Sequence, residues 1–374
     1  MDLSQIRQEI DSTDNQILEL FLKRMKLCVS VAEYKKANNL PVFQGKREDE
    51  ILDRVGSMSP DNLSCGSRLL FTNIMDISKC LQQQALVEAE QPEYFPPKSG
   101  RVTVACPGTA GSNTEQACDR LFPDKNMKFY PDFSDVFDAV ENGEADYGVL
   151  PIENSTAGEV SQTYRLLARY NFYICGSTQI KINHCLAAKK GAQVKSIYSH
   201  EQALMQCSQF LKKHGAKTVP YQNTALAAKM VADSDDMTVG AICSEQCAKM
   251  YGLDILSTGI ADNPDNTTRF ICVSKRLEIS DDADIISISL SLPHISGSLY
   301  RMLTRFAFYG LNLTRIESAP VPESSLDIKT EAFDVIFYLD FEGSIRSPEV
   351  ARLMTSLKRE MKYFKFLGNY SHLD

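Results

Sequence analysis

The N-terminal segment carries a regular apolar pattern. From Leu3 to Tyr34, apolar and long side chains recur at alternating steps of three and four residues, the heptad seam of a long helix. Asp2 and Gln5 have the spacing of a capping box at its start, and Pro41 closes the segment. Such a helix would be about 55 Å long. Residues 1–90 show helical patterns only, and their two shorter helices cannot cover a stripe of that length. We therefore expect a second copy of the chain to cover it.

Residues 101–278 change to an alternation of short apolar runs and helical patterns. This alternation predicts an α/β domain with mostly parallel strands. The expected strands are Arg101–Ala105, Tyr147–Leu150, Ile174–Cys175, Ile182–Ala187, Thr218–Tyr221, Val239–Ile242 and Phe270–Val273.

A third pattern begins near residue 285. Ile286, Ile288 and Leu290 alternate with serines, which predicts a half-buried strand. The order βαββαβ predicts a small ferredoxin-like α+β domain. Its other expected elements are a helix through Leu299, Leu303 and Phe306, strands near Leu313–Ser318 and Phe333–Phe341, a helix starting at Ser347 and Pro348, and a strand near Phe364–Leu367.

Two breaks separate these patterns. Residues 91–100 contain three prolines and a glycine, which indicates a linker, and a weaker break falls at residues 277–284. We therefore expect a helical domain over residues 1–90, a linker over 91–100, an α/β domain over 101–278 and an α+β domain over 279–374.

Composition and charge narrow the classes of function. The chain has 374 residues, with 40 Lys and Arg against 48 Asp and Glu, and its net charge of −8 argues against a nucleic-acid surface spread over the whole molecule. Eleven cysteines without a CxxC pair are typical of a reducing compartment. The polar start of the chain does not resemble a signal peptide, and no apolar run has membrane-spanning length. We expect a cytoplasmic protein that binds neither nucleic acid nor membrane.

Arg24 interrupts the apolar seam of the first helix. Taken alone, it is explained as an exposed or snorkelling arginine, or as a polar residue that fixes register. Lys35 favours another explanation, because eleven residues at about 100° each return it to nearly the same face of the helix. Two cations on one face can converge on a small dianion. Arg47, Glu48, Ser78 and Gln82 would add polar groups from the next two helices.

These residues resemble the all-helical chorismate mutase family. The resemblance rests on Arg7, Arg24, Lys35, Arg47 with Glu48, Ser78 and Gln82, while Gln44 stands where the family often has Asp. It implies a site shared across an intertwined dimer, with Arg7 supplied by the other chain. Arg7 and Arg24 would clamp the carboxylates of chorismate, and Lys35 and Gln82 would stabilise the charge growing on the ether oxygen. Glu48 would accept from the substrate hydroxyl. No nucleophile, metal or cofactor is needed.

Several expected strands in residues 101–278 run into Ser- or Thr-bearing helix starts. These are Gly111–Thr114, Asn154–Thr156, Ser199–Glu201 and Asn223–Thr224. Each one alone is ordinary N-capping, but several at the strand ends of one α/β unit can gather backbone N–H groups around an anion. His184 and His200 are expected to be structural.

This segment resembles prephenate dehydratases, which have two α/β lobes like those of solute-binding proteins, with the site in the cleft. The resemblance is carried by the segments around Asn154, Ser199 and Thr268, and the first loop departs from it at Asn113. It implies that Thr268 donates to the departing hydroxyl, with its acidity raised by Arg269 or a helix start. The implied substrate-binding residues are Ser112, Asn154, Ser155, Thr156, Ser199, Gln206 and Arg269.

The last segment resembles an ACT domain. Gly297–Tyr300 and Glu317–Pro320 occupy its two motif positions, although the family usually has Ala-Leu-Val after the glycine and Arg before the proline. Each segment alone is also explained as a helix start or a strand end. The resemblance implies a phenylalanine site at Gly297, Ser298, Leu299, Glu317 and Ser318.

Over essentially the full chain, the sequence therefore resembles bifunctional chorismate mutase/prephenate dehydratases with an ACT domain. Their substrates are chorismate and prephenate, their effector is L-phenylalanine, and a homodimer or higher homo-oligomer is implied. Two alternatives stay open at this point. One is a catalytically impaired ligand sensor, and the other is an enzyme with only one live activity.

Overall fold

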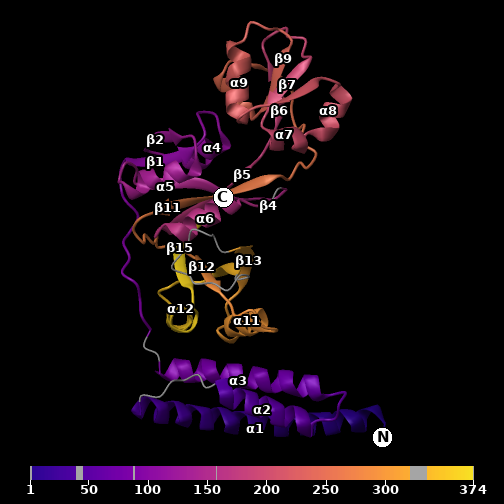
Figure 1. Cartoon of the computed structure of the whole chain (residues 1–374), viewed down its shortest axis with the longest axis vertical. Coiled ribbons are helices and arrows are strands. Elements are labelled where there is room, and N and C mark those ends of the chain that lie inside the picture. Colours follow the sequence, from indigo (N-terminus) through magenta and orange to yellow (C-terminus); the bar gives the residue numbers. More distant parts are fainter. Residues whose placement is uncertain (1, 39–44, 87–88, 157, 321–334, 374) are drawn as a thin grey trace. The chain divides into compact units, whose positions relative to one another are not determined.

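A computed structural model of the chain describes residues 2–38, 45–86, 89–156, 158–320 and 335–373 (Figure 1). The chain forms two compact units. One combines the N-terminal helices with most of residues 288–366, and the other combines residues 93–287 with the C-terminal residues 367–374.

The first unit begins with three helices, α1 (Leu3–Ala37), α2 (Gly45–Met58) and α3 (Ser64–Leu86). The capping box predicted at the start of α1 is confirmed, because the Gln5 N–H donates to the Asp2 side chain at 2.9 Å and the Asp2 N–H donates to the Gln5 side chain at 3.0 Å. Both α1 and α2 pack against α3 (Figure 1). The helical character predicted for this region is therefore confirmed.

Most of the apolar seam of α1 is exposed in the single chain. Leu3, Leu20 and Leu27 are each at least 60% exposed, and Met25 and Ala32 are the apolar residues of α1 that are buried. An apolar stripe of this length on one helix is unusual for a surface that faces water. The second copy expected to cover it remains a prediction.

The second unit contains two lobes, each built around a sheet. The first lobe has strand order β16-β5-β11-β3-β1-β2, with the short β4 (Gly158–Glu159) beside β3. Its elements are β1 (Val102–Pro107), α4 (Asn113–Leu121), β2 (Lys125–Tyr130), α5 (Phe133–Glu141), β3 (Tyr147–Asn154), α6 (Ser161–Arg169), β5 (Tyr173–Lys181), β11 (Thr267–Ser274) and β16 (His372–Leu373).

The second lobe has strand order β10-β6-β9-β7-β8. Its elements are β6 (Cys185–Ala188), β7 (Ser196–Ser199), α7 (Glu201–Gln206), α8 (Ser208–His214), β8 (Lys217–Pro220), α9 (Thr224–Asp233), β9 (Val239–Cys243), α10 (Glu245–Met250) and β10 (Asp254–Ser257). The chain enters this lobe after β5 and leaves it before β11 (Figure 1).

The expectation of mostly parallel strands is wrong. β11 runs antiparallel to both of its neighbours, β3 and β5, and β6 runs antiparallel to β9 and β10. The reason is the path of the chain between the lobes. The chain leaves the first lobe on β5 and returns on β11, and it enters the second lobe on β6 and leaves on β10, so the outgoing and returning strands of each pair run in opposite directions. The expected strand over 182–187 also starts later, at Cys185, since the Ile182 N–H donates to the carbonyl of Asn266 at this crossing.

The remaining elements are β12 (Ile285–Ser291), α11 (Ser298–Phe308), β13 (Leu313–Pro320), β14 (Val335–Glu342), α12 (Pro348–Glu360) and β15 (Phe364–Tyr370). Their order confirms the predicted βαββαβ pattern, in a sheet of order β13-β14-β12-β15. The expectation that β12 is half-buried is wrong, since Ser287 and Ser289 are also buried. Their hydroxyls lie within hydrogen-bond distance of Tyr370 at 2.7 Å and Tyr363 at 3.2 Å, which satisfies polar groups in a buried strand.

The residues at the two expected domain boundaries, near Phe95 and Leu277, hydrogen-bond to each other within the second unit. Phe95, in the expected linker, donates its N–H to the Leu277 carbonyl and accepts from the Ile279 N–H, both at 2.9 Å. At the other end of the chain, β16 pairs in parallel with β5, so the C-terminal residues join the first lobe. Across the described residues, none of the helices is both long and apolar enough to cross a membrane.

Gly368 provides a test of this packing. A Cβ at Gly368 of β15 would lie 2.0 Å from the backbone oxygen of Ile174 on β5. A Cβ at Gly176, which is also on β5, would make ordinary contacts at 3.5 Å or more. We expect Gly368→Ala to lower the free energy of unfolding by at least about 2 kcal/mol, because backbone atoms cannot move aside cheaply. Gly176→Ala is the matched control and should unfold near the wild-type urea midpoint. Equal midpoints for the two variants would contradict the described approach of β15 to β5.

Candidate active sites

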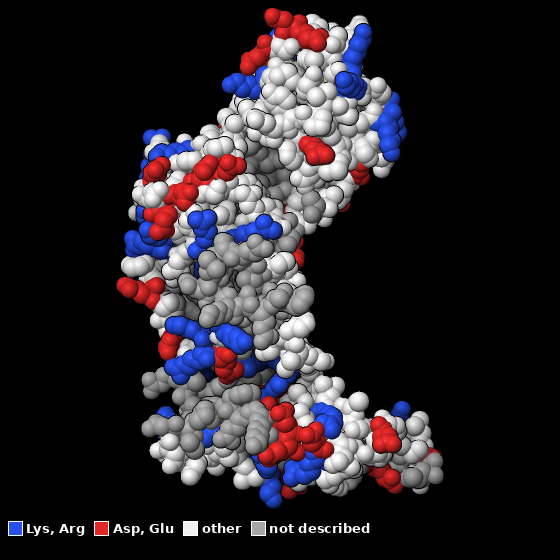
Figure 2. Space-filling view, in the orientation of Figure 1, with Lys and Arg blue, Asp and Glu red and all other residues white. Residues whose placement is uncertain are grey.

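The two lobes of the second unit enclose a cleft of about 670 Å³. Asn154 at the end of β3 and Thr268 near the start of β11 line it from the first lobe. His200, Gln206 and Asn223 line it from the second lobe. The described lining includes no Lys, Arg, Asp or Glu. On the face that Figure 2 shows, charged side chains of both signs lie on the described surface.

Helix N-termini supply the positive potential in this cleft. Ser112 caps α4 by accepting from the Glu115 N–H at 3.2 Å, and Asn223 caps α9 by accepting from the Leu226 N–H at 2.7 Å. Ser161, the first residue of α6, also lines the cleft. Unpaired backbone N–H groups at such starts carry partial positive charge. The cleft is therefore suited to an anion held by neutral donors.

Three of the four predicted helix starts are confirmed, at Ser112, His200 and Asn223. The fourth, at Asn154–Thr156, is wrong. β3 runs through Asn154, and α6 begins only at Ser161, after the short strand β4. Asn154 thus acts at a strand end, where its side chain can reach across to the neighbouring strand.

Asn154 and Thr268 face each other across the β3–β11 pair. Asn154 Oδ1 accepts from the Thr156 N–H at 3.1 Å, which orients the amide so that Nδ2 donates to Thr268 Oγ1 at 2.8 Å. The two side chains are only 8% and 9% exposed. Because Thr268 Oγ1 accepts this bond, its own proton remains to be donated to a group in the cleft.

Asn266 organises the same corner, a role that was not predicted although the residue lies in the segment around Thr268 that carries the family resemblance. Its Oδ1 accepts from Asn154 Nδ2 at 2.9 Å, from Thr156 Oγ1 at 3.1 Å and from Ser155 Oγ at 3.4 Å. Asn266 is 1% exposed. Its buried amide oxygen thereby holds the end of β3 and the two residues that follow it.

His184 belongs to the cleft as well. Its Nε2 lies 3.0 Å from Gln206 Oε1, and both residues are part of the lining. Burial lowers the pKa of His184, and the bond to Gln206 offsets only part of this effect. A neutral His184 that donates from Nε2 orients Gln206 with its amide nitrogen available to a ligand. His184 was expected to be structural, but it also contacts Gln206, a predicted site residue, in the cleft.

Four other predicted residues lie outside the described lining of this cleft, namely Ser155, Thr156, Ser199 and Arg269. Ser199 is fully buried and donates to the Ile242 carbonyl at 2.7 Å. Ser155 and Thr156 bond to Asn266, and Thr156 lines a second cavity of about 370 Å³.

Of the two groups expected to raise the acidity of Thr268, Arg269 has its guanidinium on the Tyr370 hydroxyl. Successive strand residues point to opposite faces, and the Arg269 guanidinium donates to the Tyr370 hydroxyl at 2.8 Å. Asn154, rather than Arg269, is the polar side chain that contacts Thr268 Oγ1.

The helical region brings a second set of predicted residues toward its interior. Arg24 is half-buried and donates to the Ile74 carbonyl of α3 at 3.4 Å, which favours an inward-facing side chain over an exposed one. Lys35, Ser78 and Gln82 are at most 9% exposed. Burial lowers the pKa of Lys35, and Cys28 and Glu48 offset part of that effect. Gln82 Oε1 is buried without a hydrogen-bond partner among the described residues.

Other residues of this set do not converge within one chain. Arg47 is exposed and pairs with Glu50 at 2.9 Å on the same helix. Arg7 is exposed near the start of α1. Gln44 lies outside the described residues.

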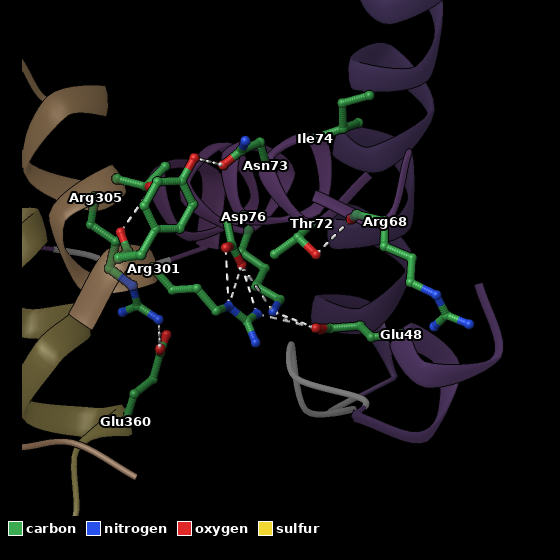
Figure 3. A network of polar contacts seen from close by, with 12 residues as sticks. Glu48, Arg68, Thr72, Asn73, Ile74, Asp76, Arg301, Arg305 and Glu360 are labelled. Carbon is green, nitrogen blue, oxygen red and sulfur yellow. Dashed lines mark hydrogen bonds and ion pairs between the residues drawn. The ribbon is translucent and has the colours of Figure 1, made fainter. Parts of the chain in front are cut away.

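A charged cluster beside Glu48 was not predicted (Figure 3). Lys79 Nζ lies 2.7 Å from Glu48 Oε2 and 3.4 Å from Asp76 Oδ1, and Arg301 of α11 contacts both carboxylates. Asp76 and Lys79 have the i, i+3 spacing of an ordinary helix pair, so the sequence carries no sign that they are buried. Arg301 is 253 residues from Glu48.

The C-terminal segment contains a cavity of about 700 Å³ at the start of α11. Gly297 adopts φ 84°, a left-handed conformation that suits glycine, directly before the helix. Of the predicted effector residues, Gly297, Ser298, Leu299 and Ser318 line this cavity. Glu317 is outside its lining and pairs with Arg315 at 3.6 Å, because alternate residues of β13 point to opposite faces.

In comparison with known proteins, two family models match separate parts of the chain. Residues 6–83 match the family model of chorismate mutase type II, and residues 104–278 match that of prephenate dehydratase. The chain is 32% identical to the bifunctional chorismate mutase/prephenate dehydratase of Aquifex aeolicus over 99% of this chain and 98% of that one. It is 31% identical to the protein of the same name from Neisseria gonorrhoeae, over 97% and 95%.

A solved structure matches most of the chain. The prephenate dehydratase of Arthrobacter aurescens, in complex with L-Phe, matches with a TM-score of 0.64 and 32% identity. The match covers 72% of this chain and 90% of that chain.

Proposed function

The chain belongs to the family of bifunctional chorismate mutase/prephenate dehydratases, and on this premise we propose which of its residues carry each reaction. The enzyme of this family rearranges chorismate to prephenate and converts prephenate to phenylpyruvate in phenylalanine biosynthesis. The observation that carries the assignment is the Asn154–Thr268 hydrogen bond in a cleft lined by helix N-termini.

In the mutase reaction, the site has to hold a flexible dicarboxylate in a compact conformer. Arg24, together with Arg7 from a partner copy, would bind the carboxylates. As the ether bond breaks, negative charge grows on its oxygen, and Lys35 and Gln82 would donate to it. Glu48 would accept from the substrate hydroxyl, Ser78 of α3 would add a second polar group to the site, and Arg47 would add positive potential. Gln44 would lie near the same hydroxyl.

A partner copy supports this arrangement. Arg7 and Arg24 are 17 residues apart on one straight helix, or about 25 Å, too far to bind the same small ligand. The exposed apolar seam of α1 gives a second copy a surface to cover. A homodimer in which α1 runs antiparallel to its copy would bring the partner's arginine to each site.

In the dehydratase reaction, the ring carboxylate of prephenate leaves as carbon dioxide. Its electron pair makes the ring aromatic and expels the ring hydroxyl. Thr268 would give its proton to that departing hydroxyl, which leaves as water, and the Thr268 alkoxide would regain a proton from solvent. The starts of α4, α6 and α9 would hold the carboxylates, Gln206 would position the substrate, and Asn154 would orient the Thr268 hydroxyl. Ser155, Thr156 and Ser199 would support this site through the residues they contact.

The C-terminal cavity is the proposed effector site. Gly297 leaves room for the backbone of an amino acid, and the start of α11 offers N–H groups to its carboxylate. The relative from Arthrobacter aurescens, which binds L-Phe in its solved structure, supports L-phenylalanine as the ligand. All eleven cysteines lie in the described residues without a disulfide, which supports a reducing, cytoplasmic location.

Separate sites predict selective loss of activity. We expect Arg24→Ala to lower mutase kcat/KM by at least about a hundredfold while dehydratase activity on supplied prephenate is kept. Thr268→Ala should have the opposite selectivity, with a loss of about 10²–10⁴-fold. Lys26→Ala and Thr267→Ala are the neighbouring controls. A folded variant that loses both activities would overturn the two-site assignment.

A shared mutase site predicts complementation. In a two-fold dimer, mixing inactive Arg7→Ala and Arg24→Ala chains would create heterodimers with one intact site, so activity should recover to about a quarter of the wild-type level. Exchange of subunits is followed with a tag on one variant. Demonstrated exchange without recovery of mutase activity would exclude the shared site.

The effector cavity predicts inhibition by L-phenylalanine. Ser318→Leu, which fills the cavity, should raise the phenylalanine concentration needed for half-inhibition of the dehydratase by at least about tenfold. Glu317→Ala changes the opposite face of β13 and serves as the control. The measurement is the dehydratase rate on prephenate as phenylalanine is added. Unchanged inhibition in Ser318→Leu would place the effect elsewhere.

A further inference from the structure

Arg301 contacts two acidic residues of the helical region although it lies in α11, far along the chain. Its Nη2 donates to Asp76 Oδ1 at 2.7 Å, and its Nε donates to Asp76 Oδ2 at 3.0 Å, which is the two-pronged geometry in which arginine binds carboxylates. The same Nη2 lies 3.3 Å from Glu48 Oε2 (Figure 3). One guanidinium thus connects α2 and α3 to α11.

The charges of this cluster balance. Glu48 and Asp76 are the two anions, and Lys79 and Arg301 are the two cations. The side chains of Glu48, Asp76 and Lys79 are at most 16% exposed, so an unpaired charge here would be costly. Loss of Arg301 would leave two buried carboxylates to share one lysine.

Both cations of the cluster contact the same oxygen of the Glu48 carboxylate. Lys79 and Arg301 both bind Oε2. Among the described residues, Oε1 accepts no hydrogen bond from protein. Two cations on one oxygen fix the rotation of the carboxylate and leave the other oxygen able to accept from a ligand hydroxyl.

A second contact fastens α11 to the same helix. The hydroxyl of Tyr300 donates to Asn73 Oδ1 of α3 at 2.9 Å, one residue before Arg301. The first turn of α11 is therefore attached to α3 at two adjacent positions, which holds the Arg301 side chain over Glu48 and Asp76 (Figure 3).

We propose that Arg301 is a positioning residue of the mutase site, which orients Glu48 toward the substrate hydroxyl from the C-terminal part of the chain. This inference rests on the proposed role of Glu48. It means that the mutase site includes a support that the isolated N-terminal helices would lack.

The test compares two arginines of one helix in the full-length enzyme. Arg301→Gln should lower mutase kcat/KM by between about tenfold and a hundredfold, because Glu48 loses its fixed orientation. Arg301→Lys should recover part of that loss by restoring the charge. Arg305→Gln, one turn later, removes an ion pair with Glu360 instead and should leave mutase activity within about twofold. Dehydratase activity on prephenate should be unchanged in all three, which shows that the chain is folded.

A second substrate separates positioning from a general structural role. With a chorismate analogue that lacks the ring hydroxyl, Glu48 has nothing to accept, so Arg301→Gln and wild type should rearrange it at similar rates. An equal loss on chorismate and on the analogue would overturn the proposal, as would equal mutase activity of Arg301→Gln and Arg305→Gln.

Glu48→Gln distinguishes failure of this proposal from failure of the assignment beneath it. If Glu48→Gln leaves mutase activity unchanged, the role of Glu48 is wrong and the role of Arg301 falls with it. If Glu48→Gln lowers activity and Arg301→Gln does not, only the role of Arg301 is wrong.

Discussion

The antiparallel pairing of β11 with β3 is the constraint on which the dehydratase cleft depends. It sets Thr268 opposite Asn154, although the two are 114 residues apart in the sequence. β11 is also the strand on which the chain returns from the second lobe, so one pairing both follows this crossing and places the hydroxyl that we propose as the proton donor. The Asn154 amide then determines that Thr268 Oγ1 is an acceptor in this bond, which leaves its proton for the substrate.

The two reactions act on similar dicarboxylates, yet the two sites bind charge in different ways. The proposed helical site would bind the substrate through cationic side chains, and the buried carboxylates of Glu48 and Asp76 are paired with Lys79 and Arg301, as an unpaired buried charge would be costly. The cleft uses backbone N–H groups at helix starts, which require no such balance. This difference fits the chemistry, since charge grows on a single ether oxygen in one reaction, whereas the other needs a proton for a departing hydroxyl.

Local signals in the sequence predicted the local features well. The capping box at Asp2, the helix starts at Ser112 and Asn223, and the βαββαβ order each depend on neighbouring residues, and each is confirmed. The expectation of mostly parallel strands failed at β11 because strand pairing depends on the route of the chain through another lobe. Asn266 and Arg301 were missed for the same reason. Their importance comes from contacts with residues that are distant in the sequence, which no spacing pattern records.

We propose that Asn154 acts through Thr268, and a double-mutant cycle on dehydratase kcat/KM tests this role directly. The variants are Asn154→Ala, Thr268→Ala and the two together, measured on supplied prephenate with mutase activity as the control for folding. If Asn154 serves mainly to orient the Thr268 hydroxyl, the double variant should be hardly less active than Thr268→Ala alone. Losses that simply multiply would contradict the account, because they would show that the two side chains act independently.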